Sequence, residues 1–123
     1  MQKFILFFLM LGMTMIACNS HEAKPLELNK GEKWVANAAT TKAINNMLTI
    51  VSKPNLSTDE FQEQMNNEFN LIFKNCTMKG EAHRQLHNFL LALKSKINQL
   101  DKNSTADKKE LTNYLQSYFD YFK

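Results

Sequence analysis

Apolar side chains recur every three to four residues through four segments of this chain, and no segment alternates apolar and polar residues for long. A period near 3.6 residues is that of an α-helix with one buried face. The pattern therefore predicts four helices, at about residues 32–52, 57–76, 81–101 and 104–123. Their short connections favour antiparallel neighbours, so we expect an all-α, up-down-up-down four-helix bundle.

Local signals mark the ends of these predicted helices. Pro54 disfavours helix at the residue before it, and so ends the first segment. Ser57 and Glu60 have the spacing of a capping box, in which each side chain bonds the backbone of the other. Gly80 is a natural site of chain reversal after a helix, and Ser104 is a second N-cap candidate.

The first 17 residues have a different pattern from the rest. Lys3 precedes an apolar run of about 13 residues, which is too short to span a bilayer core that requires about 20 helical residues. It fits the hydrophobic region of a signal peptide. The tetrapeptide at residues 15–18 resembles the lipobox of bacterial lipoproteins, which prefers Leu where Met15 stands. The alternative is an ordinary secretory signal cut near Ala17, which leaves Cys18 as a free thiol.

This interpretation divides the chain into three parts. We expect a signal peptide at residues 1–17, a lipidated Cys18 with a flexible tether to residue 30, and a four-helix domain at residues 31–123. The tether resembles those of Bacteroidota lipoproteins. Glu22 is the only acid near the anchor, whereas surface-exposed members carry an acidic export signal. The expected location is the cell envelope, on the periplasmic side of the outer membrane.

The charge of the chain argues against a nucleic-acid partner. It has 15 basic and 12 acidic side chains, and loss of Lys3 with the signal leaves a formal charge of +2. Arg84 is the only arginine, and no basic cluster is interleaved with aromatic residues.

Candidate ligands for a metal ion gather around the predicted turn between the second and third helices. Cys76 is the last apolar-stripe position before the turn, Met78 lies within it, and His83 and His87 follow at a spacing that shares one helix face. Helices pack about 8–10 Å apart, so side chains from both can reach one ion at about 2.0–2.3 Å. Sulfur with imidazole favours copper(I), with zinc second.

Simpler interpretations of these residues remain open. A cysteine on an apolar stripe is most often a small core residue, and a histidine near a helix start is often a satisfied polar group. If Cys18 carries lipid, Cys76 has no partner within the chain, and it can be buried, metal-bound or bonded to another protein.

The same block carries a resemblance to a family. Cys76-x-Met78-x-Gly80-x-Ala82-His83-x-x-Leu86-His87, preceded by Trp34, resembles a group of small, functionally uncharacterised helical lipoproteins and periplasmic proteins of bacteria. The similarity covers about residues 33–100. It implies proximity to metal-handling, especially copper-handling, proteins, and it assigns no activity.

The chain lacks the common catalytic motifs, so we expect no enzyme. It has no GxSxG, P-loop, GxGxxG or CxxCH sequence. The function we expect is a lipid-anchored helical protein that binds a soft metal, and the alternative is a membrane-tethered interaction or scaffold module without a ligand site. The aromatic residues near the C-terminus are expected to be mostly core with a tyrosine rim, and a protein partner would dock on their outward members; they are Tyr114, Tyr118, Phe119, Tyr121 and Phe122.

The lipoprotein hypothesis makes a prediction about the mature amino terminus. Mass spectrometry of protein from the producing cells should find a chain that starts at Cys18 and carries acyl chains. Cys18→Ser should move the protein out of the membrane fraction. An unmodified first residue in the wild-type protein would contradict the hypothesis.

Overall fold

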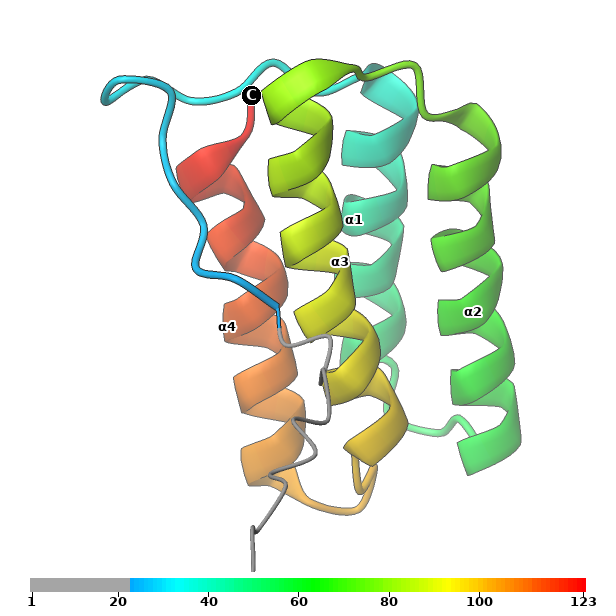
Figure 1. Cartoon of the computed structure of the whole chain (residues 1–123). Coiled ribbons are helices and arrows are strands. Elements are labelled where there is room, and N and C mark those ends of the chain that lie inside the picture. Colours follow the sequence, from blue (N-terminus) through cyan, green and yellow to red (C-terminus); the bar gives the residue numbers. More distant parts are fainter. Residues whose placement is uncertain (1–22) are drawn as a thin grey trace, which may run out of the picture.

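The protein, described here by a computed structural model of residues 23–123, is an antiparallel four-helix bundle (Figure 1). The helices are α1 (Ala38–Ser52), α2 (Thr58–Asn75), α3 (Gly80–Gln99) and α4 (Thr105–Tyr121). Helices adjacent in sequence pack against each other, and α1 also packs against α4, which closes a square. This arrangement confirms the all-α, up-down-up-down prediction. The signal peptide and Cys18 lie outside the described residues.

The capping box predicted at the start of α2 is present. Ser57 Oγ accepts a hydrogen bond from the Glu60 amide at 3.2 Å, and Glu60 Oε2 accepts one from the Ser57 amide at 2.8 Å. These bonds from Ser57 hold the pKa of Glu60 below its usual value. Ser104 caps α4 in a related way, because its Oγ accepts from the Asp107 amide at 3.2 Å.

Aromatic rings occupy the core between α3 and α4. Phe89 stacks on Tyr114 with ring centroids 4.8 Å apart, and it meets Tyr118 and Phe122 edge-on at 5.6 and 6.4 Å. Tyr118 and Phe122 are fully buried, which agrees with the expectation that most of the C-terminal aromatic residues belong to the core. Tyr114, Phe119 and Tyr121 are half-buried and pack on its edge.

The first helix begins at Ala38, so the predicted start at residue 32 is wrong. The backbone before α1 pairs instead with the end of α4. Trp34 donates to the Tyr121 carbonyl at 2.8 Å and accepts from the Lys123 amide at 2.9 Å, and Ala36 donates to the Lys123 carbonyl at 2.9 Å. This parallel bridge holds the segment extended, because its peptide groups cannot also form helical bonds.

We call residues 23–37 the N-terminal strap. Lys30 and Gly31 both have positive φ, 52° and 88°, at the centre of a tight turn closed by two hydrogen bonds between Asn29 and Glu32. Before this turn the strap runs along the side of the bundle, and after it the strap crosses the end of the bundle to reach α1 (Figure 1).

Two contacts fix the far arm of the strap. Gln85 Oε1, on a side chain only 2% exposed, accepts from the Glu27 amide at 2.9 Å, while Trp34 Nε1 donates to the Glu27 carbonyl at 2.6 Å. Leu26 packs against the core. The part of the expected tether from Leu26 onward is therefore held on the bundle, which differs from the prediction of a flexible linker to residue 30.

Among the described residues, no helix is both long enough and apolar enough to cross a membrane.

Tyr114 provides a test of the core. Its hydroxyl donates to the Phe89 carbonyl at 3.0 Å, and burial raises its pKa from 10 to about 12. The neutral phenol therefore favours the folded state fully below pH 10, and this contribution is lost as the pH rises to about 12. Tyr114→Phe should lower the free energy of unfolding at pH 7 by about 0.5–1.5 kcal/mol. Urea unfolding at several pH values should then show a shallower alkaline decline than in wild type, whereas identical declines would contradict this account.

Candidate functional site

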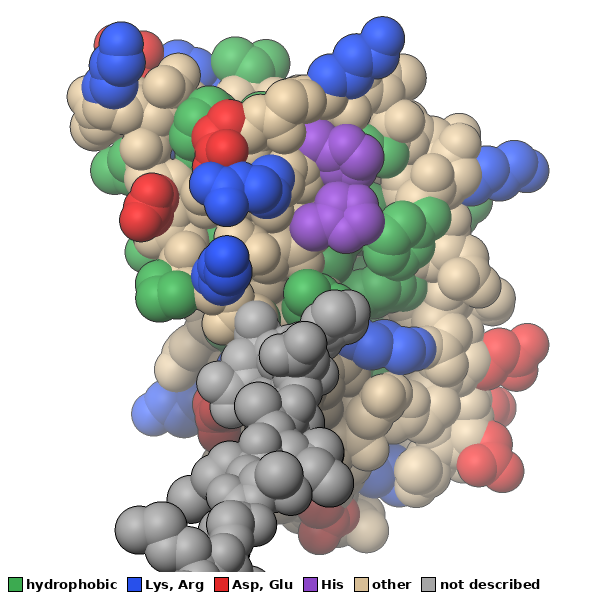
Figure 2. Space-filling model, in the orientation of Figure 1, with side chains coloured by type: hydrophobic (Ala, Val, Ile, Leu, Met, Phe, Trp, Pro, Cys, Tyr) green, Lys and Arg blue, Asp and Glu red, His purple; other side chains and the backbone are tan. Residues whose placement is uncertain are grey.

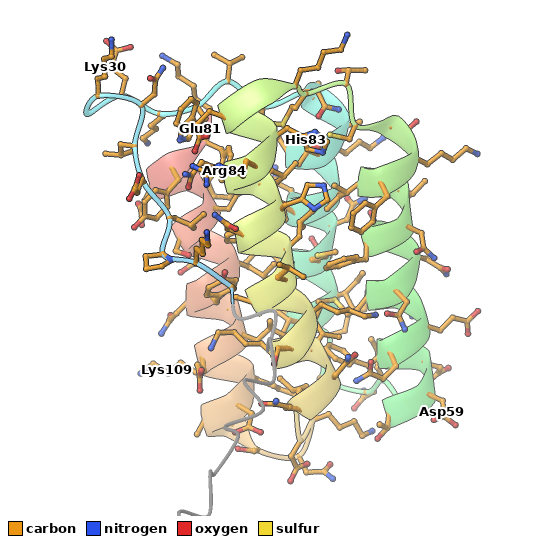
Figure 3. All side chains as sticks on the ribbon, in the orientation of Figure 1. Lys30, Asp59, Glu81, His83, Arg84 and Lys109 are labelled. Carbon is orange, nitrogen blue, oxygen red and sulfur yellow. The ribbon has the colours of Figure 1, made fainter. Side chains whose placement is uncertain are left out.

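The two histidines of the described chain lie on successive turns near the start of α3. Their Nε2 atoms form a hydrogen bond of 2.9 Å, in which one ring donates and the other accepts according to their tautomers, and their ring centroids are 4.6 Å apart with planes at 53°. His83 is half-buried and His87 is exposed. The prediction that the pair shares one helix face is confirmed, and Figure 3 shows His83 at the top of α3 on the side toward α2.

His87 borders an apolar groove between α2 and α3. The His87 ring meets Phe73 edge-on at 6.0 Å, and the other residues lining the groove are Phe69, Leu90, Leu91 and Lys94. Lys94 Nζ hydrogen-bonds Asn66 Oδ1 and lies 5.4 Å from the centre of the Phe69 ring. Figure 2 shows the two imidazoles side by side with hydrophobic side chains next to them. We call this feature the histidine groove.

Cys76 does not lie on the last turn of α2. The helix ends at Asn75, whose carbonyl accepts from Asn37 Nδ2 at 3.0 Å, and Cys76 has extended backbone angles of −67° and 121°. Cys76 is half-buried and free, and like Met78 it packs against the hydrophobic core. The sulfur ligands thus contact the core, whereas the exposed His87 ring borders the groove.

Residues 23–123 contain no group of three or more His, Cys, Asp or Glu side chains placed to hold a metal ion. Of the four candidate ligands, the structure brings His83 and His87 together, and Cys76 is not grouped with both of them. Participation of Cys76 and Met78 stays a prediction that needs a rearrangement of the loop at residues 76–79.

The nearest acid on the same helix is already engaged. Glu81 accepts two hydrogen bonds from Arg84, at 2.8 and 2.7 Å, and one from Gln85 Nε2 at 2.9 Å. These bonds, with that of Arg84 first, lower the pKa of Glu81. Its charge is balanced by the guanidinium, so the two imidazoles are the ligands best placed in this part of α3.

The spacing of the two nitrogens restricts the coordination they can give. With metal–nitrogen bonds of about 2.0–2.1 Å, nitrogens 2.9 Å apart subtend an angle of about 90° at the ion. A tetrahedral ion would need them about 3.3 Å apart, given the same bond lengths. Right angles are typical of tetragonal copper(II) or nickel(II) rather than zinc. The same separation is that of the hydrogen bond between the two rings, so an ion would have to displace the shared proton before both nitrogens could bind it.

Comparison with known proteins returns no match to a family model, to a curated protein or to a solved structure. The class of protein is thus defined by its fold, an all-α four-helix bundle with an N-terminal strap.

The residues that complete the histidine groove were not among the sequence-based candidates. Phe73 lies beside the apolar stripe of α2, and Leu91 directly follows Leu90, which belongs to the apolar stripe of α3. Each is an extra apolar position next to a helical stripe, and this is the signal that could have indicated an exposed apolar surface.

Proposed function

We propose that this protein is a non-enzymatic, lipid-anchored bundle of the bacterial cell envelope that binds a copper ion through His83 and His87. The observation that carries the proposal is the 2.9 Å separation of their Nε2 atoms, which suits two adjacent positions around one ion. Cys18 supplies the anchor.

The local structure supports a preformed pair of ligands. Both rings are fixed on one regular helix, so their spacing does not depend on a loop. The Phe73 ring contacts the ring of His87, with their centroids 6.0 Å apart. Two imidazoles leave further coordination positions for solvent, for an external ligand, or for Cys76 and Met78 after a loop movement.

The test is a titration of the full-length protein in detergent micelles with copper(II), copper(I) and zinc, each against a chelating competitor. His83→Ala and His87→Ala should each weaken copper(II) binding at least tenfold, about 1.4 kcal/mol. Asn88→Ala, at the next residue on α3, is the matched control and should bind as wild type does. Paramagnetic resonance of the copper(II) complex should show nitrogen coupling that either histidine substitution reduces.

Cys76→Ser and Met78→Leu distinguish the two-histidine site from the four-residue site. The structure leads us to expect that neither substitution weakens copper(II) binding. A loss of copper(I) binding in either variant would show that the loop rearranges to supply sulfur. Wild-type binding that is indifferent to both histidine substitutions would contradict the proposal.

A second function is favoured by one observation. Phe73 and Leu91 expose 51% and 46% of their surface beside the histidine groove, and exposed apolar residues mark interaction sites when they cluster. A membrane-tethered interaction or scaffold module would use this surface and bind no metal. Failure of the copper titration would leave this alternative.

A further inference from the structure

The start of the strap shows where the anchor must lie. Residues 23–26 line a groove beside α3 and α4, and the helical residues that line its other side are Asn88, Ala92, Tyr114, Ser117, Asp120 and Tyr121. The strap is held there by the bond from the Glu27 amide to Gln85. The chain therefore leaves the bundle alongside α3, at a fixed place.

Cys18 precedes Ala23 by only five positions, with four residues between them. A fully extended chain spans at most about 3.3–3.6 Å per residue. Cys18 therefore lies within about 17 Å of Ala23, at the α3–α4 groove. This maximum length of the connection is little greater than the width of a helix with its side chains, about 10–12 Å. An anchored bundle must therefore keep the neighbourhood of α3 close to the bilayer.

The outer surface of α3 is flanked by both grooves. Asn88 and Ala92 line the groove that holds the strap, while His87 and Leu91, each one residue earlier, line the histidine groove. The first described residues of the strap and the histidine groove are thus separated by the breadth of one helix. Figures 1 and 2, drawn from one direction, show the strap, α3 and the histidines on the same side of the molecule.

The chemistry of this side suits a lipid surface. Phe73 and Leu91 are half exposed, and Lys94 lines the same groove with its ammonium group over the Phe69 ring. Exposed aromatic and aliphatic side chains beside lysines are typical of segments that lie in the membrane interface. The diagonal helix α1 presents the polar residues Lys42, Asn45 and Thr49 to solvent.

We infer that the bundle lies on the bilayer with the outer face of α3 and the histidine groove against the lipid headgroups, and with α1 facing away. The inference rests on the lipid anchor at Cys18 in the proposed function. It does not require that the histidines bind copper. The lipid surface would bury Phe73 and Leu91, which the bundle itself leaves exposed.

The test uses the full-length, lipidated protein in vesicles of phosphatidylcholine and phosphatidylglycerol whose acyl chains are brominated near the headgroups. Trp34 is the only tryptophan, so it gives a constant background. Leu91→Trp places a second indole on the inferred contact face, and Asn45→Trp places one on α1 as the matched control. We expect at least twofold stronger bromine quenching of the added fluorescence in Leu91→Trp than in Asn45→Trp.

Equal quenching of the two added indoles, or stronger quenching of Asn45→Trp, would overturn the inferred orientation. Phe73→Trp is the second reporter if Leu91→Trp lowers the helical circular dichroism, and it should be quenched as strongly. Mass spectrometry of the same preparation distinguishes failure of the lipid anchor from failure of the inferred orientation. Unlipidated Cys18 would overturn the anchor and the orientation together, whereas lipidated protein with equal quenching would overturn the orientation alone.

Discussion

The pairing of the strap with the end of α4 is the interaction on which the rest of this structure depends. Three backbone hydrogen bonds join Trp34 and Ala36 to Tyr121 and Lys123, each typically worth about 0.5–1.5 kcal/mol net. They tie the segment before the first helix to the end of the last one. The Trp34 indole also donates a hydrogen bond to the Glu27 carbonyl. The same pairing therefore determines where the chain leaves the bundle.

The helices could be predicted from the sequence because their signals are local. Apolar periodicity located all four, and Ser57, Glu60 and Ser104 located two N-termini within one residue. The strap could not be predicted in this way. Trp34, Ala38 and Thr41 continue the helical spacing of α1, but the peptide groups of residues 34 and 36 pair with residues 121 and 123, more than 80 positions away in the chain. Periodicity carries no information about such long-range backbone pairing.

The candidate site shows the same division between local and long-range effects. The position of His83 and His87 on one helix face follows from their spacing of four residues, and it was correctly predicted. The position of Cys76 was not, because α2 ends at Asn75, where Asn37 from the start of α1 bonds its carbonyl. Exposure of Phe73 and Leu91 depends on how α2 and α3 pack, so the histidine groove was also missed.

The strap links the two proposals in space. It leaves the bundle beside α3, the helix that carries both imidazoles, so an anchor at Cys18 would hold the copper ligands near the membrane surface. An ion bound there would be exchanged with molecules at the bilayer rather than with those deeper in the periplasm. The histidine groove would then serve as both the contact with lipid and the approach to the metal. Without a fixed strap, the anchor would not determine which face of the bundle meets the membrane.

The most direct test of this account is hydrogen exchange of individual backbone amides in the full-length protein, measured by nuclear magnetic resonance. The amides of Glu27, Trp34, Ala36 and Lys123 each donate a hydrogen bond that joins the strap to α3 or to the end of α4. The account predicts that all four exchange at least about tenfold more slowly than unstructured peptide, since each must open to exchange. Exchange of these amides at the unstructured rate, with the helices still protected, would contradict it.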